Sequence, residues 1–275
     1  MATNIANEMA GEHFPPLIRR LLYIQSLNVE EIAVLMKMHE HARFIDERTI
    51  FLHQGNVQKK CMIVTKGWAY RFNELSDGNR QIINYYLPGD IISPFAVIVP
   101  KIGYSVASIT LLEVCVFEPE YLVELFATQP KLGLLYGWML GRDDSMVAEQ
   151  VVRVGRRSAY KRTAHLLLEL FHRLKIIGET ENKTFSMPVS QQLLADTLGL
   201  SFVHMNRTLK KLRTDNLISM DSKEIRLLDI DKLKQLAEYQ VCYMEQIKNL
   251  STIIENLDAD NTPLAQNVSY LKKFK

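Results

Sequence analysis

The chain has 275 residues, of which 47% are hydrophobic, and a formal net charge of +2. This length and composition predict one large or two modest globular domains. No apolar run approaches a membrane span, and the polar N-terminus MATNIANEMAGEHF lacks the order of a secretory signal. Cys61, Cys115 and Cys242 form no close pair, which argues against a disulfide framework and a cysteine-rich metal or iron–sulfur site. We therefore expect a reduced, cytoplasmic protein with no membrane contact and no cofactor.

Charge is unevenly spread along the chain. Residues 1–152 hold 13 Lys and Arg against 17 Asp and Glu, a net charge of −4. Residues 153–215 hold 12 against 5, a net charge of +7, and residues 216–275 hold 8 against 9, a net charge of −1. A basic block between slightly acidic flanks predicts a localised surface for a polyanion.

The pattern of the N-terminal part changes from helical to strand-like. Residues 17–38 predict one or two short helices, with Asn28 as the cap of the second. Residues 43–118 alternate short β-rich runs with turn signals, among them Asp77-Gly78, which tolerates the positive φ of a tight hairpin. Several short strands at close spacing predict a small antiparallel barrel or jelly roll.

A long run without proline after Pro130 predicts a long helix that is apolar on two faces. The two stripes are Leu132, Leu135, Met139 and Met146, and Leu140, Val147, Val151 and Val154. Since both faces must be buried, the helix either packs on its own β domain and on a partner subunit, or is enclosed within one chain.

The basic block predicts a winged helix. An amphipathic helix begins near Ser158, and the polar stretch GETENKTFSMP predicts a loop. Two further helices, 190–198 and 201–216, precede a short hairpin, LISMDSKEIRLLDI. Three helices followed by a small hairpin describe this fold.

The second and third helices predict a helix-turn-helix. Ser190 and Ser201 suit their N-caps, and Gly199 stands where the chain must leave the first helix at positive φ. The inward face of the last helix consists of Met205, Leu209 and Leu212. Its outward face consists of Phe202, Val203, Asn206, Arg207 and Lys210.

The outward side chains are of the types that read DNA in the major groove. Arg207 suits a bidentate pair with guanine and Asn206 one with adenine, while Phe202 and Val203 suit thymine methyl groups. The predicted phosphate contacts are Lys210, Lys211 and Arg213. His204 either contacts a phosphate or packs. The alternative is a solvated basic helix face, which leaves the turn, the caps and the following hairpin unexplained.

Four stretches together resemble the Crp/Fnr family of bacterial transcription regulators, over roughly residues 17–233. GWAYRF and DGNRQIINYYLPGDII resemble the family's β-barrel sensor, and GRRSAYKRTAHLLLEL resembles its linker into the DNA-binding domain. LGLSFVHMNRTLKKLRTDNLI resembles the recognition motif of a branch that carries Val-His-Val-Asn-Arg here. The resemblance implies a homodimer joined through the long helix, a two-fold DNA site and a signal read by the barrel.

We therefore predict an α+β protein of four parts. They are a cyclic-nucleotide-binding-like antiparallel β-barrel or jelly-roll sensor (17–130), a dimerisation helix (131–155), a winged helix-turn-helix with recognition helix 201–215 (156–230), and a helical C-terminal extension (231–275). The predicted partners are double-stranded DNA, a second copy of the chain, RNA polymerase and a small-molecule effector.

Two functions from other classes are the alternatives to a DNA-binding regulator. One is a ligand-binding signalling module that acts through protein contacts and carries a degenerate DNA-binding head. The other is an enzyme, which we do not expect because the chain carries no phosphate loop, nucleophile elbow or HExxH motif.

The sensor departs from the cyclic-nucleotide-binding branch at the residues that hold the ligand in that branch. Ser93 and Pro94 stand where Gly-Glu is expected, and Tyr104 stands where arginine is expected, before Ser105. A cyclic phosphate would lose its guanidinium partner and the ribose its carboxylate, so we expect a signal other than cyclic AMP. The candidate effector pocket consists of Ser93, Pro94, Phe95, Tyr104 and Ser105. The iron–sulfur branch needs an N-terminal cysteine cluster, which residues 1–60 lack.

Other constellations stay open as alternatives. Candidate haem ligands are His39, His41 and His53. A metal patch on one helix would use His165, Glu169 and His172. Lone histidines are more often packing or surface residues, so we predict no metal site. Cys115 is expected to be a small core residue, with a redox switch as the alternative.

The C-terminal part carries a three-four repeat typical of a helix with an apolar seam. Its positions are Leu233, Leu236, Gln240, Tyr243, Ile247, Leu250, Ile254 and Leu257. The predicted helix either packs on its own chain, forms a second dimer contact, or docks on the sensor and restrains the DNA-binding heads.

Overall fold

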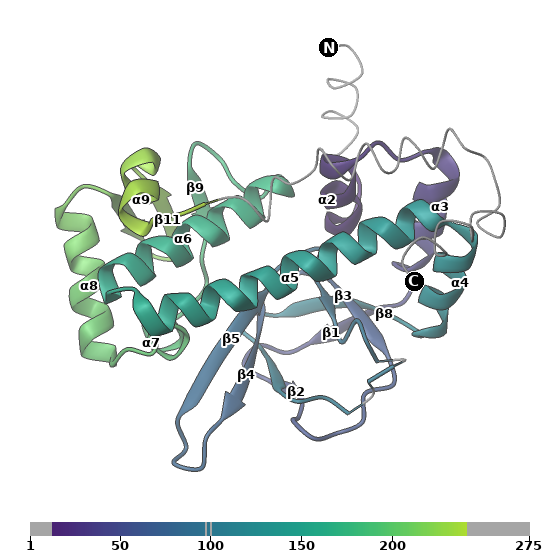
Figure 1. Cartoon of the computed structure of the whole chain (residues 1–275), viewed down its shortest axis with the longest axis horizontal. Coiled ribbons are helices and arrows are strands. Elements are labelled where there is room, and N and C mark those ends of the chain that lie inside the picture. Colours follow the sequence, from purple (N-terminus) through teal and green to yellow (C-terminus); the bar gives the residue numbers. More distant parts are fainter. Residues whose placement is uncertain (1–12, 97, 100, 241–275) are drawn as a thin grey trace, which may run out of the picture. The chain divides into compact units, whose positions relative to one another are not determined.

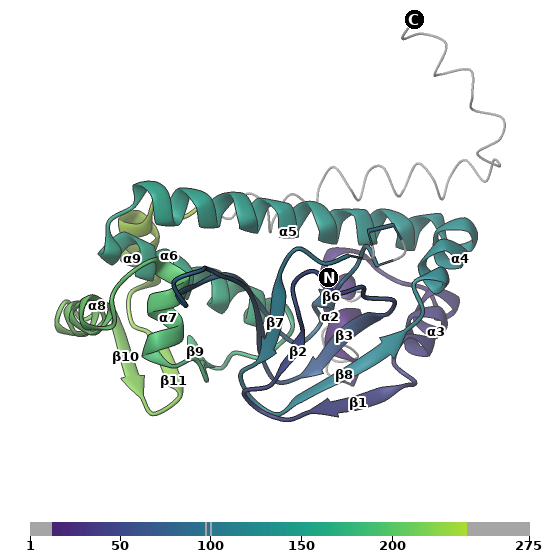
Figure 2. The same cartoon turned by 90° about the horizontal axis from the view of Figure 1, so that it is seen from below.

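The computed structural model describes residues 13–96, 98, 99 and 101–240, and Figures 1 and 2 show it from two directions. Two helices come first in this part of the chain, α2 (Pro16–Ile24) and α3 (Val29–Lys37). Asn28 caps α3 through a capping box: its side chain accepts from the backbone N–H of Glu31, and the Glu31 carboxylate accepts from the Asn28 N–H. The predicted cap at Asn28 is confirmed.

Within the described residues, eight strands between α3 and α4 form two antiparallel four-stranded sheets. The first sheet has the order β1 (Ala42–Ile45), β8 (Leu112–Phe117), β3 (Cys61–Lys66) and β6 (Ile91–Ile92). The second has the order β2 (Ile50–Leu52), β7 (Ser105–Ser108), β4 (Ala69–Glu74) and β5 (Arg80–Tyr86). The predicted antiparallel β domain is confirmed.

Apolar side chains from both sheets form the core of the β domain. Val64 and Val114 come from the first sheet, and Ala69, Tyr86 and Val106 come from the second. All five are buried, and each large apolar side chain removed from water in this way stabilises the fold by about 1.5–3 kcal/mol. The outward side of β5 contacts α5 and α7, so both faces of the second sheet are covered at this strand.

Two glycines fix the turns on either side of β5. In the β4–β5 hairpin, Gly78 takes φ 81° and the Leu75 N–H donates to the Asn79 carbonyl over 2.7 Å. The predicted turn at Asp77-Gly78 is thereby confirmed. Gly89, after β5, takes φ 85°, and an added Cβ would lie 3.0 Å from backbone atoms of Pro16 and Leu17. A side chain at Gly89 would therefore separate α2 from the turn that leads into β6.

Two helices follow the β domain, α4 (Glu120–Thr128) and the 27-residue α5 (Pro130–Arg156). The first predicted stripe of α5 is buried within the chain: Leu132, Leu135, Met139 and Met146. The second stripe is not enclosed, since Val151 is 65% exposed and Leu140, Val147 and Val154 are half-buried. The described residues therefore do not enclose α5 on its second face.

The C-terminal domain contains the predicted three helices and hairpin, α6 (Ala159–Ile176), α7 (Gln191–Leu198), α8 (Phe202–Thr214), β10 (Ile218–Asp221) and β11 (Glu224–Leu227). The prediction of a loop over GETENKTFSMP is wrong in part, because Thr184–Ser186 form β9, which pairs with β11. Phe185 is the reason: it is buried and its ring lies 6.0 Å from that of Phe171. Phe185 and Met187 alternate with polar Ser186 and are both buried, but two apolar positions are too short a pattern to indicate a strand from the sequence.

The described chain ends in a shorter helix than the repeat predicts. Leu233 and Leu236 lie in α9 (Ile230–Ala237), and Glu238 then takes φ 52°, which ends the helix. Tyr239 is buried beside His165 and His172, with ring centres 4.8 and 5.2 Å apart. A continuous helix over residues 233–257 is therefore wrong at residues 238–240, because the chain turns there to bury an aromatic ring. Residues 241–257 of the repeat lie outside the described residues.

Candidate nucleic-acid interface

Three local signals set the geometry of the helix-turn-helix formed by α7 and α8. The Ser190 hydroxyl accepts from the Leu193 N–H over 3.2 Å, and the Ser201 hydroxyl accepts from the His204 N–H over 3.3 Å. Between them, Gly199 takes φ 61° and ends α7 in the left-handed region. Both predicted caps and the glycine turn are confirmed.

The inner face of α8 holds the helix against α6 and α7. Met205, Leu209 and Leu212 are each at most 1% exposed, as their spacing predicted. Thr208 is also buried, and its hydroxyl donates to the His204 carbonyl over 2.9 Å, which satisfies a polar group that would otherwise be costly to bury. Packing therefore fixes which side of α8 faces outward.

The outer face of α8 carries the residues predicted to touch DNA. Phe202 and Val203 are 48% and 57% exposed, and Asn206 is half-buried. The remaining exposed side chains are His204, Arg207, Lys210, Lys211 and Arg213. None of the four cations among them is ion-paired with another described residue, so their charges are available to phosphates.

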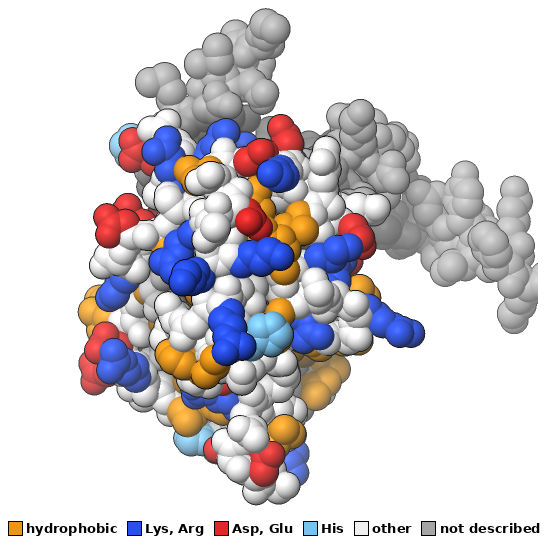
Figure 3. All heavy atoms as spheres, turned by 90° about the vertical axis from the view of Figure 1, so that its left-hand side faces the viewer, with side chains coloured by type: hydrophobic (Ala, Val, Ile, Leu, Met, Phe, Trp, Pro, Cys, Tyr) orange, Lys and Arg blue, Asp and Glu red, His pale blue; other side chains and the backbone are white. Residues whose placement is uncertain are grey.

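An open groove of about 860 Å³ runs between α8 and the N-terminus of α6. Its lining includes Arg207 and Lys211 from α8 and Ser158 and Tyr160 at the start of α6. Figure 3 shows the side of the molecule at which α8 lies, where Lys and Arg side chains are spread widely. The first turn of α6 contains no acidic residue, so its N-terminal dipole adds to the attraction for an anion.

Tyr160 is a residue of this groove that the sequence analysis missed. Its hydroxyl donates to the Asp215 carboxylate, and the Lys211 ammonium lies 4.7 Å from the centre of its ring. Burial and the Asp215 carboxylate raise the pKa of Tyr160 to about 12, so the phenol remains protonated at neutral pH. No spacing signal reveals this residue, because α6 and α8 meet only in the tertiary fold.

Known proteins match both domains of the chain. A cyclic nucleotide-binding domain model matches residues 42–129, and a Crp-like helix-turn-helix domain model matches residues 161–236. The transcriptional activatory protein AadR of Rhodopseudomonas palustris is 30% identical over 203 residues, which cover 73% of this chain and 82% of AadR. The chain belongs to the Crp/Fnr family of transcription regulators. The predictions of a DNA-binding regulator, and of a regulator rather than an enzyme, are thereby confirmed.

Further relatives of this regulator agree with that assignment. The nitrogen fixation regulation protein FixK of Bradyrhizobium diazoefficiens is 27% identical over 80% of this chain and 91% of FixK. The structure of FixK2 from Bradyrhizobium japonicum has a TM-score of 0.64 at 21% identity and covers 72% of this chain and 98% of FixK2. The c-di-GMP responsive regulator CLP of Xanthomonas campestris has a TM-score of 0.56 at 22% identity and covers 74% and 100%. At 21% and 22% identity, these two structures support only a shared fold.

The regulator's predicted effector residues have different surroundings. Ser93 is buried at φ 56°, and its carbonyl accepts from the Cys61 thiol over 3.3 Å. The Pro94 carbonyl accepts from the Tyr136 hydroxyl of α5 over 2.9 Å, and Phe95 is 47% exposed. Tyr104 directly precedes β7 and packs against the core of the β domain. Ser105 is the first residue of β7, and its hydroxyl accepts from the Gln54 N–H over 3.1 Å.

Arg71 of β4 is a sensor residue that the sequence analysis missed. Its guanidinium lies 5.4 Å from the centre of the ring of Tyr104, the residue that stands where the cyclic-nucleotide branch is expected to carry arginine. Arg71 stands two residues after Ala69 on β4, so both side chains face the core between the sheets. The alternation of inward and outward side chains along β4 could have revealed Arg71, but only once the position of β4 in the sheet was known.

The surroundings of His165, Glu169 and the two described cysteines do not favour the metal patch or the redox switch considered as alternatives. Glu169 and His165 both contact Arg153, and burial first, then Arg153 and Arg157, lower the pKa of His165 to about 2. The described part of the chain holds no group of three or more His, Cys, Asp or Glu side chains placed to bind one metal ion. Burial raises the pKa of Cys61 to about 12 and also raises that of Cys115, so neither thiol is a reactive thiolate at neutral pH.

Proposed function

We propose that the regulator binds a two-fold DNA operator as a homodimer, with α8 of each subunit in successive major grooves. The observation that carries this proposal is the division of α8 into a buried apolar face and an exposed face of base-reading and cationic side chains. In helix-turn-helix dimers, the second helix enters the major groove and half-sites lie about 34 Å apart. The groove between α6 and α8 then receives the DNA backbone.

Within this proposal, the residues of α8 divide into two roles. Arg207 and Asn206 read base edges, and Phe202 and Val203 contact thymine methyl groups. Phosphate contacts come from Lys210, Lys211, Arg213, His204 and the two cap residues Ser190 and Ser201. The second helix end in the groove, at Ser158, faces the backbone as well.

The second face of α5 supports the homodimer. Val151 is 65% and Val152 44% exposed, although both lie in the C-terminal turns of a long helix whose other face is buried on its own chain. Gly137, Gly141 and Gly155 lie on the same helix and have nothing within 4 Å of an added Cβ, so another helix backbone can approach closely there. A second copy of α5 presents the same apolar and small residues, as a two-fold contact requires.

We expect the β domain to respond to a signal other than cyclic AMP. Tyr104 supplies a phenol where a cyclic phosphate would need a guanidinium, and the nearby Arg71 lies over that ring. Cyclic AMP at about 1 mM should leave the melting temperature unchanged, since a ligand stabilises only the state it binds. A clear rise in melting temperature would contradict this expectation.

Selection of bound sequences from random DNA tests the main proposal. We expect a two-fold sequence, bound about 10³-fold or more tightly than a scrambled sequence at the same salt concentration. Equal affinity for the selected and the scrambled DNA would refute sequence-specific binding. It would then favour the signalling module with a degenerate head, which the intact caps, turn and cationic face of α8 argue against.

RNA polymerase as a partner and a cytoplasmic location remain predictions, which follow from the family resemblance and the composition. Among the described helices, none is long and apolar enough to cross a bilayer.

A further inference from the structure

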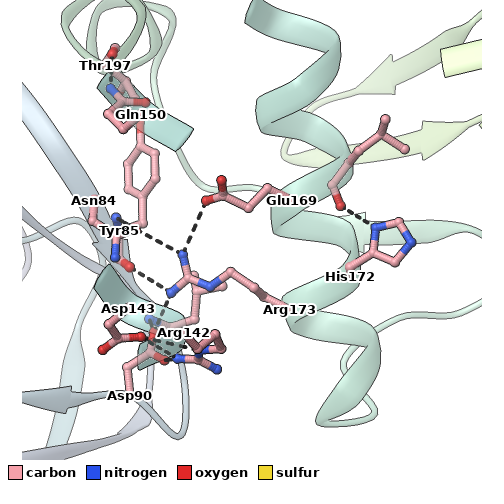
Figure 4. A network of polar contacts seen from close by, with 12 residues as sticks. Asn84, Tyr85, Asp90, Arg142, Asp143, Gln150, Glu169, His172, Arg173 and Thr197 are labelled. Carbon is pink, nitrogen blue, oxygen red and sulfur yellow. Dashed lines mark hydrogen bonds and ion pairs between the residues drawn. The ribbon is translucent and has the colours of Figure 1, made fainter. Parts of the chain in front are cut away.

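Asp90 lies between the Gly89 turn and β6, and its buried carboxylate accepts four hydrogen bonds. Oδ1 accepts from Arg20 over 2.7 Å and from Arg142 over 3.0 Å. Oδ2 accepts from Arg173 over 2.6 Å and from the Leu87 N–H over 2.7 Å. Asp90 and its three arginine partners are each at most 3% exposed, and Figure 4 shows Arg142 beside Asp90 and Arg173 extending toward it from α6.

The three arginines come from three different helices, so one carboxylate joins four segments of the chain. Arg20 belongs to α2, Arg142 to α5 and Arg173 to α6 of the DNA-binding domain. Burial by itself would raise the pKa of Asp90, yet the three guanidinium groups outweigh it and hold the pKa below its usual range. Removal of this carboxylate would leave three buried cations without their common partner.

Arg173 is the one of these arginines that belongs to the DNA-binding domain. In addition to Asp90, its guanidinium donates to the Tyr85 carbonyl over 2.8 Å and to the Asn84 side chain over 3.1 Å. Both acceptors lie on β5. A guanidinium that bridges a strand and a turn leaves α6 little freedom to shift without breaking a charged hydrogen bond.

From Arg173, further buried polar contacts continue to the helix-turn-helix. Arg173 lies 3.8 Å from Glu169, and Glu169 is paired with Arg153. Arg153 donates to the Gln150 side chain over 2.7 Å, and Gln150 donates to the Thr197 carbonyl over 2.6 Å. Thr197 stands two residues before Gly199, the turn that aims α8. Figure 4 shows several of these residues in one view.

The covalent connection between α5 and α6 is short and not helical. Arg157 takes φ −84° and ψ 147°, and Ser158 takes φ −65° and ψ 157°, so two extended residues separate the helices. An extended linker has no helical hydrogen bonds that would fix an angle. The orientation of the DNA-binding domain must therefore come from noncovalent contacts, among which Asp90–Arg173 is buried and charged.

We propose that Asp90 couples the sensor to the DNA-binding domain of the same chain, so that a displacement of the 91–95 segment moves Arg173, α6 and the helix-turn-helix together. This inference rests on the proposed DNA-binding function, because its consequence is the spacing between recognition helices. Variants that break one link at a time test whether these contacts couple the two domains energetically.

The test compares R173M with R20M. Each variant removes one arginine from the same buried carboxylate, but the hydrogen bonds of Arg20 go only to residues 88–90 of the sensor. Affinities are measured for the selected operator and for versions with one or two base pairs inserted between the half-sites. The preference for the native spacing is the ratio of affinities for the native operator and for the operators with inserted base pairs. We expect R173M to reduce this ratio about fivefold or more, which is the lower end of typical coupling between sites. We expect R20M to keep the ratio within about twofold of the wild type.

A second measurement needs no DNA and decides the proposal even if no operator is found. We expect R173M to accelerate amide hydrogen exchange in α7 about fivefold or more, with little change in β3 and β8, and R20M to leave α7 unchanged. Unchanged spacing preference and unchanged exchange in R173M would overturn the coupling, as would equal effects in R20M. If R173M does not fold, R173K replaces it, since one ammonium cannot reproduce the bridge and should act in the same direction. Absence of any selected operator for the wild type would instead count against the proposed function.

Discussion

At the residue scale, Arg207 and Lys211 lie one turn apart on the exposed side of α8 and represent two kinds of DNA contact. Arg207 carries a forked guanidinium near the N-terminal end of the helix, which in this fold meets base edges. Lys211 is a point charge further along, beside the groove and the Tyr160 ring. The same α8 face therefore provides both a base-reading role and a backbone-binding role, which mutation can separate.

Arg207→Ala should weaken binding to the selected operator by about 1–3 kcal/mol and relax the base preference at one position of each half-site. The physical reason is the loss of a bidentate pair to guanine. Gel-shift titrations on the operator and on single-base variants measure this effect. An equal loss on operator and scrambled DNA would contradict a base-reading role for Arg207.

Lys211→Ala should weaken binding to the operator and to scrambled DNA by similar factors, because a phosphate contact carries no sequence information. The slope of log affinity against log salt concentration should become shallower by about 1 for each lost contact in a half-site. Titrations between about 50 and 200 mM salt measure both quantities. An unchanged salt slope would assign Lys211 to packing on Tyr160 instead.

At the element scale, α5 is a long helix that carries apolar side chains on two faces. One of its faces is buried on the β domain and α4, while Val151 is 65% exposed on the other. A helix of this kind gains stability only when a partner covers its second apolar face. The two faces therefore assign α5 to the sensor on one side and to the proposed dimer contact on the other.

Val151→Glu should weaken the free energy of dimerisation by about 3 kcal/mol, which raises the dimer dissociation constant roughly 100-fold. The reason is that a two-fold contact loses two buried valines and gains two carboxylates. Light scattering or sedimentation over a dilution series measures it. The matched control is Val29→Glu, which changes an 84% exposed valine in the first turn of α3, where acidic residues are tolerated. If both variants keep the wild-type dissociation constant, α5 is not the dimer contact.

At the scale of the whole molecule, the buried charges around Asp90 tie the β domain and the DNA-binding domain together within the compact unit formed by the described residues. Their contribution depends on pH through Asp90. Its pKa is lower in the folded chain than in the unfolded chain, so protons bind preferentially to the unfolded state as the pH falls. The stabilisation from Asp90 is therefore complete at neutral pH and is lost in acid.

We expect the free energy of unfolding to decline as the pH falls below about 4, through the lowered pKa of Asp90. Asp90→Asn should cost about 3–5 kcal/mol at neutral pH and flatten this acid decline, because it leaves three buried arginines without a carboxylate. Urea unfolding between neutral and acidic pH measures both effects. Asp144→Asn, at an exposed position of α5, is the control and should keep the wild-type profile, while a wild type with no acid decline would contradict the prediction.

Local signals in the sequence determined the elements and the DNA-binding face. Asn28, Ser190 and Ser201 cap helices because their side chains reach N–H groups three residues ahead. The inward residues of α8 follow from a 3.6-residue period, and the outward residues follow by exclusion. These features depend on neighbours along the chain, so one sequence suffices to predict them.

Only the tertiary structure decided the features that join distant segments. β9 exists because Phe185 pairs with Ile225 of β11. Tyr160 lines the groove because Lys211 lies over its ring. α9 ends before Tyr239, whose ring packs against two histidines. Asp90 looks like the last residue of an ordinary Pro-Gly-Asp turn until α2, α5 and α6 each bring an arginine to it. Such contacts leave no periodic trace, because the folded backbone alone sets which residues meet across 52 to 83 positions of sequence.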